Sequence, residues 1–250
     1  MGRLEPACGT SNALRATAAC MLLAAATLGA IPRAATAADS QPLVQLAYAV
    51  PRPVSATETL VYPTPFARTA FRTVDAELFP KWHVAITRME LQLNGTSPAS
   101  MSADQAAKVR DAFSRIIEHV AAQSGFDMFV ATNKLINAVP YRSDQEVYGV
   151  SDYWATPIEM LAAGGGDCED HAIAKLAVLK QAGLSADKLR LVVGTDTITG
   201  KAHAMAVVEL DGIAYVLDGR TDEVATWGSA ELHFKPLYAA GFHKAWIYRS

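Results

Sequence analysis

A cysteine, a histidine and an aspartate in the second half of the chain have the types and spacing needed for acyl transfer through a thiolate. Cys168 follows three glycines (164–166) and Asp167, where a new helix is predicted to begin. The positive end of the helix dipole favours thiolate over thiol at that position. A buried, inert cysteine is the alternative. The acidic neighbours Asp167, Glu169 and Asp170 favour the reactive interpretation over an apolar one.

The histidine and the aspartate are placed by a predicted hairpin. Asp211-Gly212 is a strong two-residue turn signal between two apolar runs. If Leu210 pairs with Ile213, His203 and Asp218 become diagonal neighbours on one face of the sheet, about 7–8 Å apart at the backbone. Cys-His-Asp catalysis requires a base and its orienting acid side by side in this way. A satisfied polar pair on an otherwise apolar sheet is the alternative.

The three carboxylates around Cys168 pose an electrostatic problem, because negative charge raises the pKa of a thiol and opposes the helix dipole. A compensating cation is therefore expected, either protonated His203 or a hard divalent metal held by those carboxylates. Simple capping of the helix N-terminus by the acids remains the alternative. His171 follows Cys168 by one helical turn, so zinc held by Cys168, His171 and an acid is a further alternative, although this spacing matches no familiar closed zinc site.

The elements that must position these residues are helices followed by strands. The chain is predicted to be helical from Phe66 onward, with an N-cap at Ser102 and its capping-box partner at Gln105. Helical periodicity and stop signals then predict helices over 105–123, 126–139, 157–163 and 168–183. Strands are predicted over 189–193, 203–210 and 213–217. We therefore expect an α+β fold, with N-terminal helices packed on a C-terminal antiparallel sheet.

Three segments are expected along the chain. Residues 1–37 carry arginines, an apolar run over 16–31 and a small-x-small cleavage pattern at 35–37, which is typical of a signal peptide. An uncleaved membrane anchor is the alternative. Residues 38–65 are proline-rich and predict an extended leader, and residues 66–250 form the folded domain.

Export would leave Cys168 as the only cysteine of the mature chain, because Cys8 and Cys20 lie within the predicted signal peptide. In an oxidising compartment a lone cysteine is either buried and inert or reactive. The chain has 22 basic and 25 acidic side chains and no run of Lys or Arg, which argues against nucleic acid as a partner.

Several motifs together resemble one family. Asp152-Tyr-Trp-Ala-Thr-Pro, Gly166-Asp-Cys-Glu-Asp, Ala202-His203 and Leu217-Asp218 are similar to motifs of the bacterial transglutaminase-like cysteine proteinases. The resemblance runs from about residue 133 to 218 and more loosely from Phe66. It implies a papain/transglutaminase-like fold, with Cys168 as nucleophile, His203 as general base and Asp218 as orienting acid. It also implies calcium held by Asp167, Glu169 and Asp170.

The resemblance further implies a periplasmic cysteine endopeptidase. Adhesin-cleaving members of that family cut a large surface adhesin at a di-alanine site and thereby disperse biofilm, and an inner-membrane cyclic-di-GMP receptor sequesters them. Two departures are visible: His171 stands where an aromatic residue is expected, and Gly219-Arg220 replaces an apolar continuation after Asp218. An acyl transferase or transglutaminase on the same triad, and a non-catalytic periplasmic binding module, remain alternatives.

Overall fold

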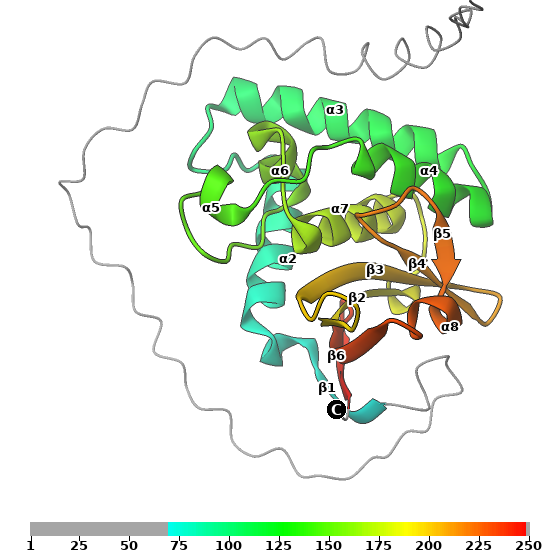
Figure 1. The fold of residues 1–250 in the computed structure, drawn as a ribbon. Helices are drawn as coiled ribbons and strands as arrows, with labels where there is room; N and C mark the ends of the chain where they lie inside the picture. The colour runs from blue at the N-terminus through cyan, green and yellow to red at the C-terminus, as the bar shows by residue number, and fades with distance from the viewer. Residues whose placement is uncertain (1–69, 249–250) are drawn as a thin grey trace, which may run out of the picture. The chain divides into compact units, whose positions relative to one another are not determined.

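The computed structural model describes residues 70–248 (Figure 1). The predicted signal peptide (1–37) and leader (38–65) lie outside the described residues. Among the residues that are described, no helix has the length and apolar character needed to cross a membrane. Helices occupy the first half of the described chain and most of the strands the second half, so the predicted α+β order is confirmed.

The helices follow the predicted stop and start signals closely. The longer ones are α2 (Pro80–Leu93), α3 (Ala103–Ala121), α4 (Phe126–Asn137), α6 (Pro157–Ala163) and α7 (Cys168–Gln181). Single turns or short helices occur at η1 (Ala76–Leu78), α5 (Asp144–Val147), η2 (Ala186–Lys188) and α8 (Trp227–Ala230). Ser102 and Gln105 form the predicted capping box of α3, and Pro157 lies in the first turn of α6.

Seven strands form one antiparallel sheet in the order β1-β7-β6-β2-β3-β4-β5. Their bounds are β1 (Ala70–Asp75), β2 (Leu189–Asp196), β3 (Ala202–Leu210), β4 (Ile213–Leu217), β5 (Val224–Thr226), β6 (Phe234–Ala240) and β7 (Lys244–Tyr248). Leu210 pairs with Ile213 as predicted. Asp211 and Gly212 both have positive φ, at 52° and 76°, as a two-residue hairpin turn requires.

Two apolar cores lie on opposite faces of this sheet. The larger one lies between the sheet and the helices, with α7 packed on β3 and β2 (Figure 1). Side chains alternate along β3, so Ala204, Ala206 and Val208 join the larger core, while Met205 and Val207 join the smaller one. Ten of the fourteen residues of α7 are buried, including Lys175, so this helix is covered on nearly every side.

The secondary structure expected for residues 70–75 was wrong. Helix was predicted from Phe66, but residues 70–75 form strand β1, which pairs with β7 in the register Asp75↔Lys244. Helix begins only at η1 and α2. Strands β5, β6 and β7 were not predicted either. Each is short or, like β6 with Pro236, carries a residue that disfavours a strand, so pairing with distant neighbours decides their conformation.

Candidate active site

Cys168 is the first residue of α7, and a pinned glycine loop leads into it. Gly166 accepts a backbone hydrogen bond from Arg142 (2.9 Å) and donates one to Pro140 (3.3 Å). A Cβ on Gly166 would lie 2.8 Å from side-chain atoms of Asp170 and Met160, so only glycine fits here without a shift of its neighbours. The loop therefore presents the cysteine at the helix N-terminus in one defined position, as the sequence predicts.

The Cys168 thiol is half-buried and donates a hydrogen bond to Glu169 Oε2 at 3.1 Å. On its other side the backbone N–H of Ala204 donates to the sulfur, which places Cys168 beside the residue that follows His203. Burial and the Glu169 carboxylate raise the pKa of Cys168, and the Ala204 N–H lowers it only in part. Within residues 70–248, no hydrogen bond joins the Cys168 sulfur to His203.

His203 and Asp218 are in direct contact, as the hairpin register predicts. His203 Nε2 lies 2.9 Å from Asp218 Oδ1, and both residues are buried, at 7% and 9% exposed. The His203 ring also meets Phe234 edge-on, at 6.4 Å between ring centroids. Since Asp218 occupies Nε2, the ring nitrogen left for a proton acceptor role is Nδ1.

A second side chain binds the same carboxylate. Arg220 donates from Nε and a terminal nitrogen to Asp218 Oδ2 at 3.1 and 2.8 Å, and its backbone N–H donates to Oδ1 at 2.9 Å. Burial disfavours ionised Asp218, but the hydrogen bonds from His203 and Arg220 outweigh it and lower its pKa. Asp218 is therefore a carboxylate at neutral pH.

The predicted metal residues lie within a larger acidic cluster. Asp144, Asp167 and Asp170 each offer a carboxylate oxygen within 4.8 Å of the others, and so do Asp144, Asp152 and Glu169. Burial, with the neighbouring carboxylates, raises the pKa of Asp167 and raises that of Asp170 to about 7. Such crowding of buried acids opposes their ionisation unless a cation offsets it.

The donor chemistry of this cluster fits a hard cation such as Ca²⁺, which takes oxygen ligands. Asp144 Oδ1 and Asp167 Oδ1 are buried and make no hydrogen bond. Their partner oxygens are positioned by other contacts: Asp144 Oδ2 accepts from the Tyr153 N–H at 2.5 Å, and the capping box of α7 uses the Asp167 side chain. Two unsatisfied buried oxygens on members of one acidic cluster are the arrangement that a bound cation would complete.

Asp144 and Asp152 were missed by the sequence reasoning. Both lie in or after the polar loop that precedes Tyr153, and their nearness to Glu169 arises only when that loop packs against α7. The available signal was the concentration of acids in this loop and the Asp152 motif itself.

His171 does not take part in the metal cluster. Its Nδ1 lies 2.7 Å from the Asp167 carbonyl oxygen and its Nε2 lies 2.9 Å from the Val139 carbonyl oxygen. Both ring nitrogens thus face backbone oxygens, which argues against the zinc alternative with Cys168. The buried ring ties the start of α7 to the end of the α4 segment.

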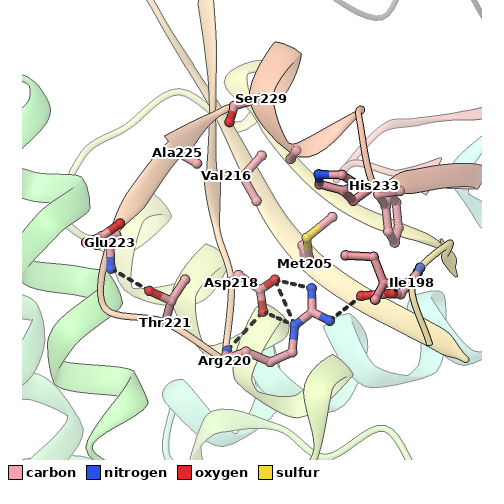
Figure 2. Close-up of a pocket in the computed structure, with 13 residues that line it drawn as sticks. Ile198, Met205, Val216, Asp218, Arg220, Thr221, Glu223, Ala225, Ser229 and His233 are labelled. Carbon is pink, nitrogen blue, oxygen red and sulfur yellow. Dashed lines mark hydrogen bonds and ion pairs between the residues drawn. The ribbon is translucent and has the colours of Figure 1, made fainter.

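A pocket of about 370 Å³ adjoins Asp218 on the sheet face that carries the smaller core. Met205 and Val216 are among its lining residues, and Figure 2 shows the Arg220 guanidinium beside the Asp218 carboxylate. Cys168 and His203 do not line this pocket. Of the three candidate residues Cys168, His203 and Asp218, it is therefore lined by Asp218 alone.

Comparison with known proteins identifies the family. Residues 102–248 match the family model described as bacterial transglutaminase-like cysteine proteinase, BTLCP. A search of curated proteins found no match.

Solved structures of Legionella pneumophila LapG have the same fold. The calcium-bound form is 24% identical with a TM-score of 0.50, over 65% of this chain and 87% of that one. The EGTA-treated form is 22% identical with a TM-score of 0.51, over 66% of this chain and 87% of that one. Because the family model covers more than half of the sequence, the chain belongs to the bacterial transglutaminase-like cysteine proteinases.

Proposed function

We propose that the protein is a calcium-dependent cysteine endopeptidase in which Cys168 is the nucleophile, His203 the general base and Asp218 the acid that orients the base. The observation that carries this proposal is the His203 Nε2–Asp218 Oδ1 contact of 2.9 Å, with the sulfur of Cys168, at a helix N-terminus, accepting a hydrogen bond from the backbone N–H of Ala204, the residue after His203. A base and its orienting group within hydrogen-bond reach, beside a nucleophile, is the arrangement that nucleophilic catalysis requires.

The reaction would proceed by acyl transfer. His203 Nδ1 takes the thiol proton, and the Cys168 sulfur bonds to a peptide carbonyl carbon. Backbone N–H groups in the first turn of α7 have no intrahelical partner and would stabilise the oxyanion. The imidazolium then protonates the leaving nitrogen as the C–N bond breaks, and water hydrolyses the thioester to a carboxylate and the free thiol.

This chemistry requires the thiol to leave Glu169 and turn to His203. Asp144, Asp152, Asp167, Glu169 and Asp170 are the side chains that would hold the cation. Bound there, Ca²⁺ would neutralise the carboxylates that raise the pKa of Cys168. A calcium-bound form of the similar LapG supports the choice of metal.

The family and the N-terminal sequence support a proposal for the substrate and the location. We propose export through the signal peptide at 1–37 and action in the periplasm on a large surface adhesin or another exported protein. An inner-membrane cyclic-di-GMP receptor is the proposed regulatory partner. Near-neutral charge and the absence of basic runs in the sequence are consistent with a protein substrate.

The test is the rate at which iodoacetamide alkylates Cys168, the only cysteine of residues 38–250, across a range of pH with calcium or with EGTA. His203→Ala is compared with His119→Ala, which removes an exposed histidine of α3. A thiolate that persists well below the free-cysteine pKa of about 8.5, and is lost in His203→Ala alone, supports the triad. Loss of this low-pH reactivity of Cys168 in EGTA supports a bound cation at the acidic cluster.

A second assay separates hydrolysis from acyl transfer. A peptide with an Ala-Ala pair is incubated with the protein, with and without a primary amine, and the products are identified by mass. Carboxylate products in both conditions support the peptidase, whereas amide products indicate a transferase. A thiol that alkylates at the same rate in wild type, His203→Ala and EGTA overturns the enzyme proposal in favour of a binding module.

A further inference from the structure

Arg220 makes more contacts with Asp218 than His203 does. Its guanidinium Nε lies 3.2 Å from Oδ1 and 3.1 Å from Oδ2, a terminal nitrogen lies 2.8 Å from Oδ2, and its backbone N–H lies 2.9 Å from Oδ1 (Figure 2). His203 contributes the single contact at 2.9 Å. The planar guanidinium thus binds the carboxylate in two-pronged fashion and sets the plane in which its oxygens lie.

Arg220 is itself anchored from a different strand. Its other terminal nitrogen lies 2.5 Å from Oδ2 of Asp196, the last residue of β2. Asp196 is 6% exposed, and its Oδ1 accepts from the N–H groups of Ile198 and Thr199 at 2.9 and 2.8 Å. The guanidinium is therefore fixed at both ends, although its side chain is 52% exposed.

The contacts form a chain that runs from Asp196 through Arg220 and Asp218 to His203. This chain involves three strands. Asp196 ends β2, His203 lies in β3 and Asp218 directly follows β4. Buried Lys175 of α7 lies in the fields of Asp218 and Asp222, and Glu223 lines the same pocket as Asp218 and Arg220. Lys175 donates to the Leu217 carbonyl at 3.3 Å and makes no hydrogen bond with the Asp218 carboxylate among the described contacts, so Arg220 is the cation that directly binds this acid.

We infer that Arg220, anchored by Asp196, is a positioning residue that holds the Asp218 carboxylate in the orientation that receives His203 Nε2. This inference rests on the proposed function for its consequence in catalysis, but the contact that it concerns is independent of turnover. Without Arg220, the carboxylate can rotate to solvent through the mouth of the pocket, and Nε2 loses its acceptor.

The test compares Arg220→Ala, Arg220→Lys and Asp196→Asn with the wild type. Arg110→Ala is the matched control, because Arg110 is an arginine of α3 whose side chain donates to the Thr96 carbonyl at 3.4 Å, away from Asp218 and His203. In protein labelled with ¹⁵N-histidine, the His203 Nε2–H proton is observed directly by NMR, as is its exchange with water. Turnover of the Ala-Ala peptide gives kcat and KM, and thermal unfolding verifies that each variant is folded.

In Arg220→Ala we expect the His203 Nε2–H signal to broaden or disappear and kcat to fall about tenfold, with KM changed less than about twofold. Arg220→Lys retains the positive charge but not the two parallel donors of the guanidinium. It should therefore recover part of the His203 Nε2–H signal and part of kcat. Asp196→Asn, which loosens only the anchor, should give a smaller loss of the same kind. Arg110→Ala should match the wild type.

An unchanged His203 signal and unchanged kcat in folded Arg220→Ala overturn the inference. If Arg220→Ala does not fold, the same two measurements on Asp196→Asn decide, and no change there also overturns it. If wild type cuts no peptide, the NMR measurement still decides: loss of the signal in Arg220→Ala supports the positioning role while the proposed function fails.

Discussion

Lys175 should make the stability of the protein rise with pH. This lysine of α7 is 0% exposed, and its Nζ donates to the Leu217 carbonyl at 3.3 Å. Burial lowers the pKa of Lys175 to about 7, and the fields of Asp218 and Asp222 oppose this shift only in part. Between that pKa and the value of about 10.4 in an unfolded chain, the unfolded state binds the extra proton, so the free energy of unfolding increases as pH rises.

The magnitude follows from the gap between the two pKa values. A pKa difference of about 3.5 units between the unfolded and folded states corresponds to roughly 5 kcal/mol in the free energy of unfolding. Below about pH 7 the protein lacks all of this stabilisation, and it is recovered as the pH rises. From about pH 6.5 to about pH 8.5 the wild type should gain about 2 kcal/mol relative to Lys175→Met, which carries no titrating group. Lys175→Met also leaves the Leu217 carbonyl unpaired, at a cost of about 1–3 kcal/mol that does not vary with pH.

Urea unfolding of the wild type and Lys175→Met at several pH values measures this difference. Working with the difference removes the contributions of tyrosines and of Cys168, which titrate in both proteins. Lys180→Met is the matched control, because Lys180 lies on the same helix with a partly exposed side chain that pairs with Glu90 at 3.2 Å. A wild-type minus Lys175→Met difference that stays constant or falls with rising pH would refute the reasoning.

Three further outcomes are expected. Calcium at about 100 times its Kd should stabilise the fold by about 2.7 kcal/mol. The Tm should therefore rise with calcium but not with calcium plus EGTA. Equal Tm values under the two conditions would contradict the metal site. Gly194→Ala places a Cβ against the Lys235 carbonyl and should cost about 1–3 kcal/mol. Gly228→Ala, with open space around the new Cβ, should stay near the wild type, and equal urea midpoints for both variants would contradict this packing. Trp82→Phe loses the hydrogen bond from Nε1–H to the Gly241 carbonyl at 2.8 Å and should lower the free energy of unfolding by about 1–3 kcal/mol. Urea midpoints measure this loss, and an unchanged midpoint would contradict the contribution of this buried hydrogen bond to stability.

Local signals predicted the parts of the fold that local chemistry determines. The Ser102–Gln105 capping box and Pro157 mark helix starts because their effects act within one turn. Asp211-Gly212 determines the hairpin register because both residues accept positive φ, and the register alone brings His203 to Asp218. The contact between His203 and Asp218 was therefore predictable from a two-residue turn.

Features that depend on distant pairing were not predictable in this way. Residues 70–75 form strand β1 because they pair with β7, which lies more than 160 residues later in the sequence. Asp144 joins Asp167 and Asp170 through the packing of a loop on α7, and Arg220 meets Asp196 only once β2 lies beside β3. No periodicity or spacing in the sequence encodes such contacts, since each requires the assembled sheet or helix layer.

The candidate site is divided between the β3–β4 hairpin, which carries His203 and Asp218, and the helix layer, which carries Cys168. This division affects when the site forms during folding. His203 and Asp218 are joined by a tight turn and can meet as soon as the hairpin closes, a step of microseconds. Cys168 belongs to α7 and reaches them only when the helices dock on the sheet. Until α7 packs on the sheet, the Cys168 thiol is therefore separated from the His203–Asp218 pair. The candidate site is therefore assembled by the packing of the helices on the sheet and not by the hairpin alone.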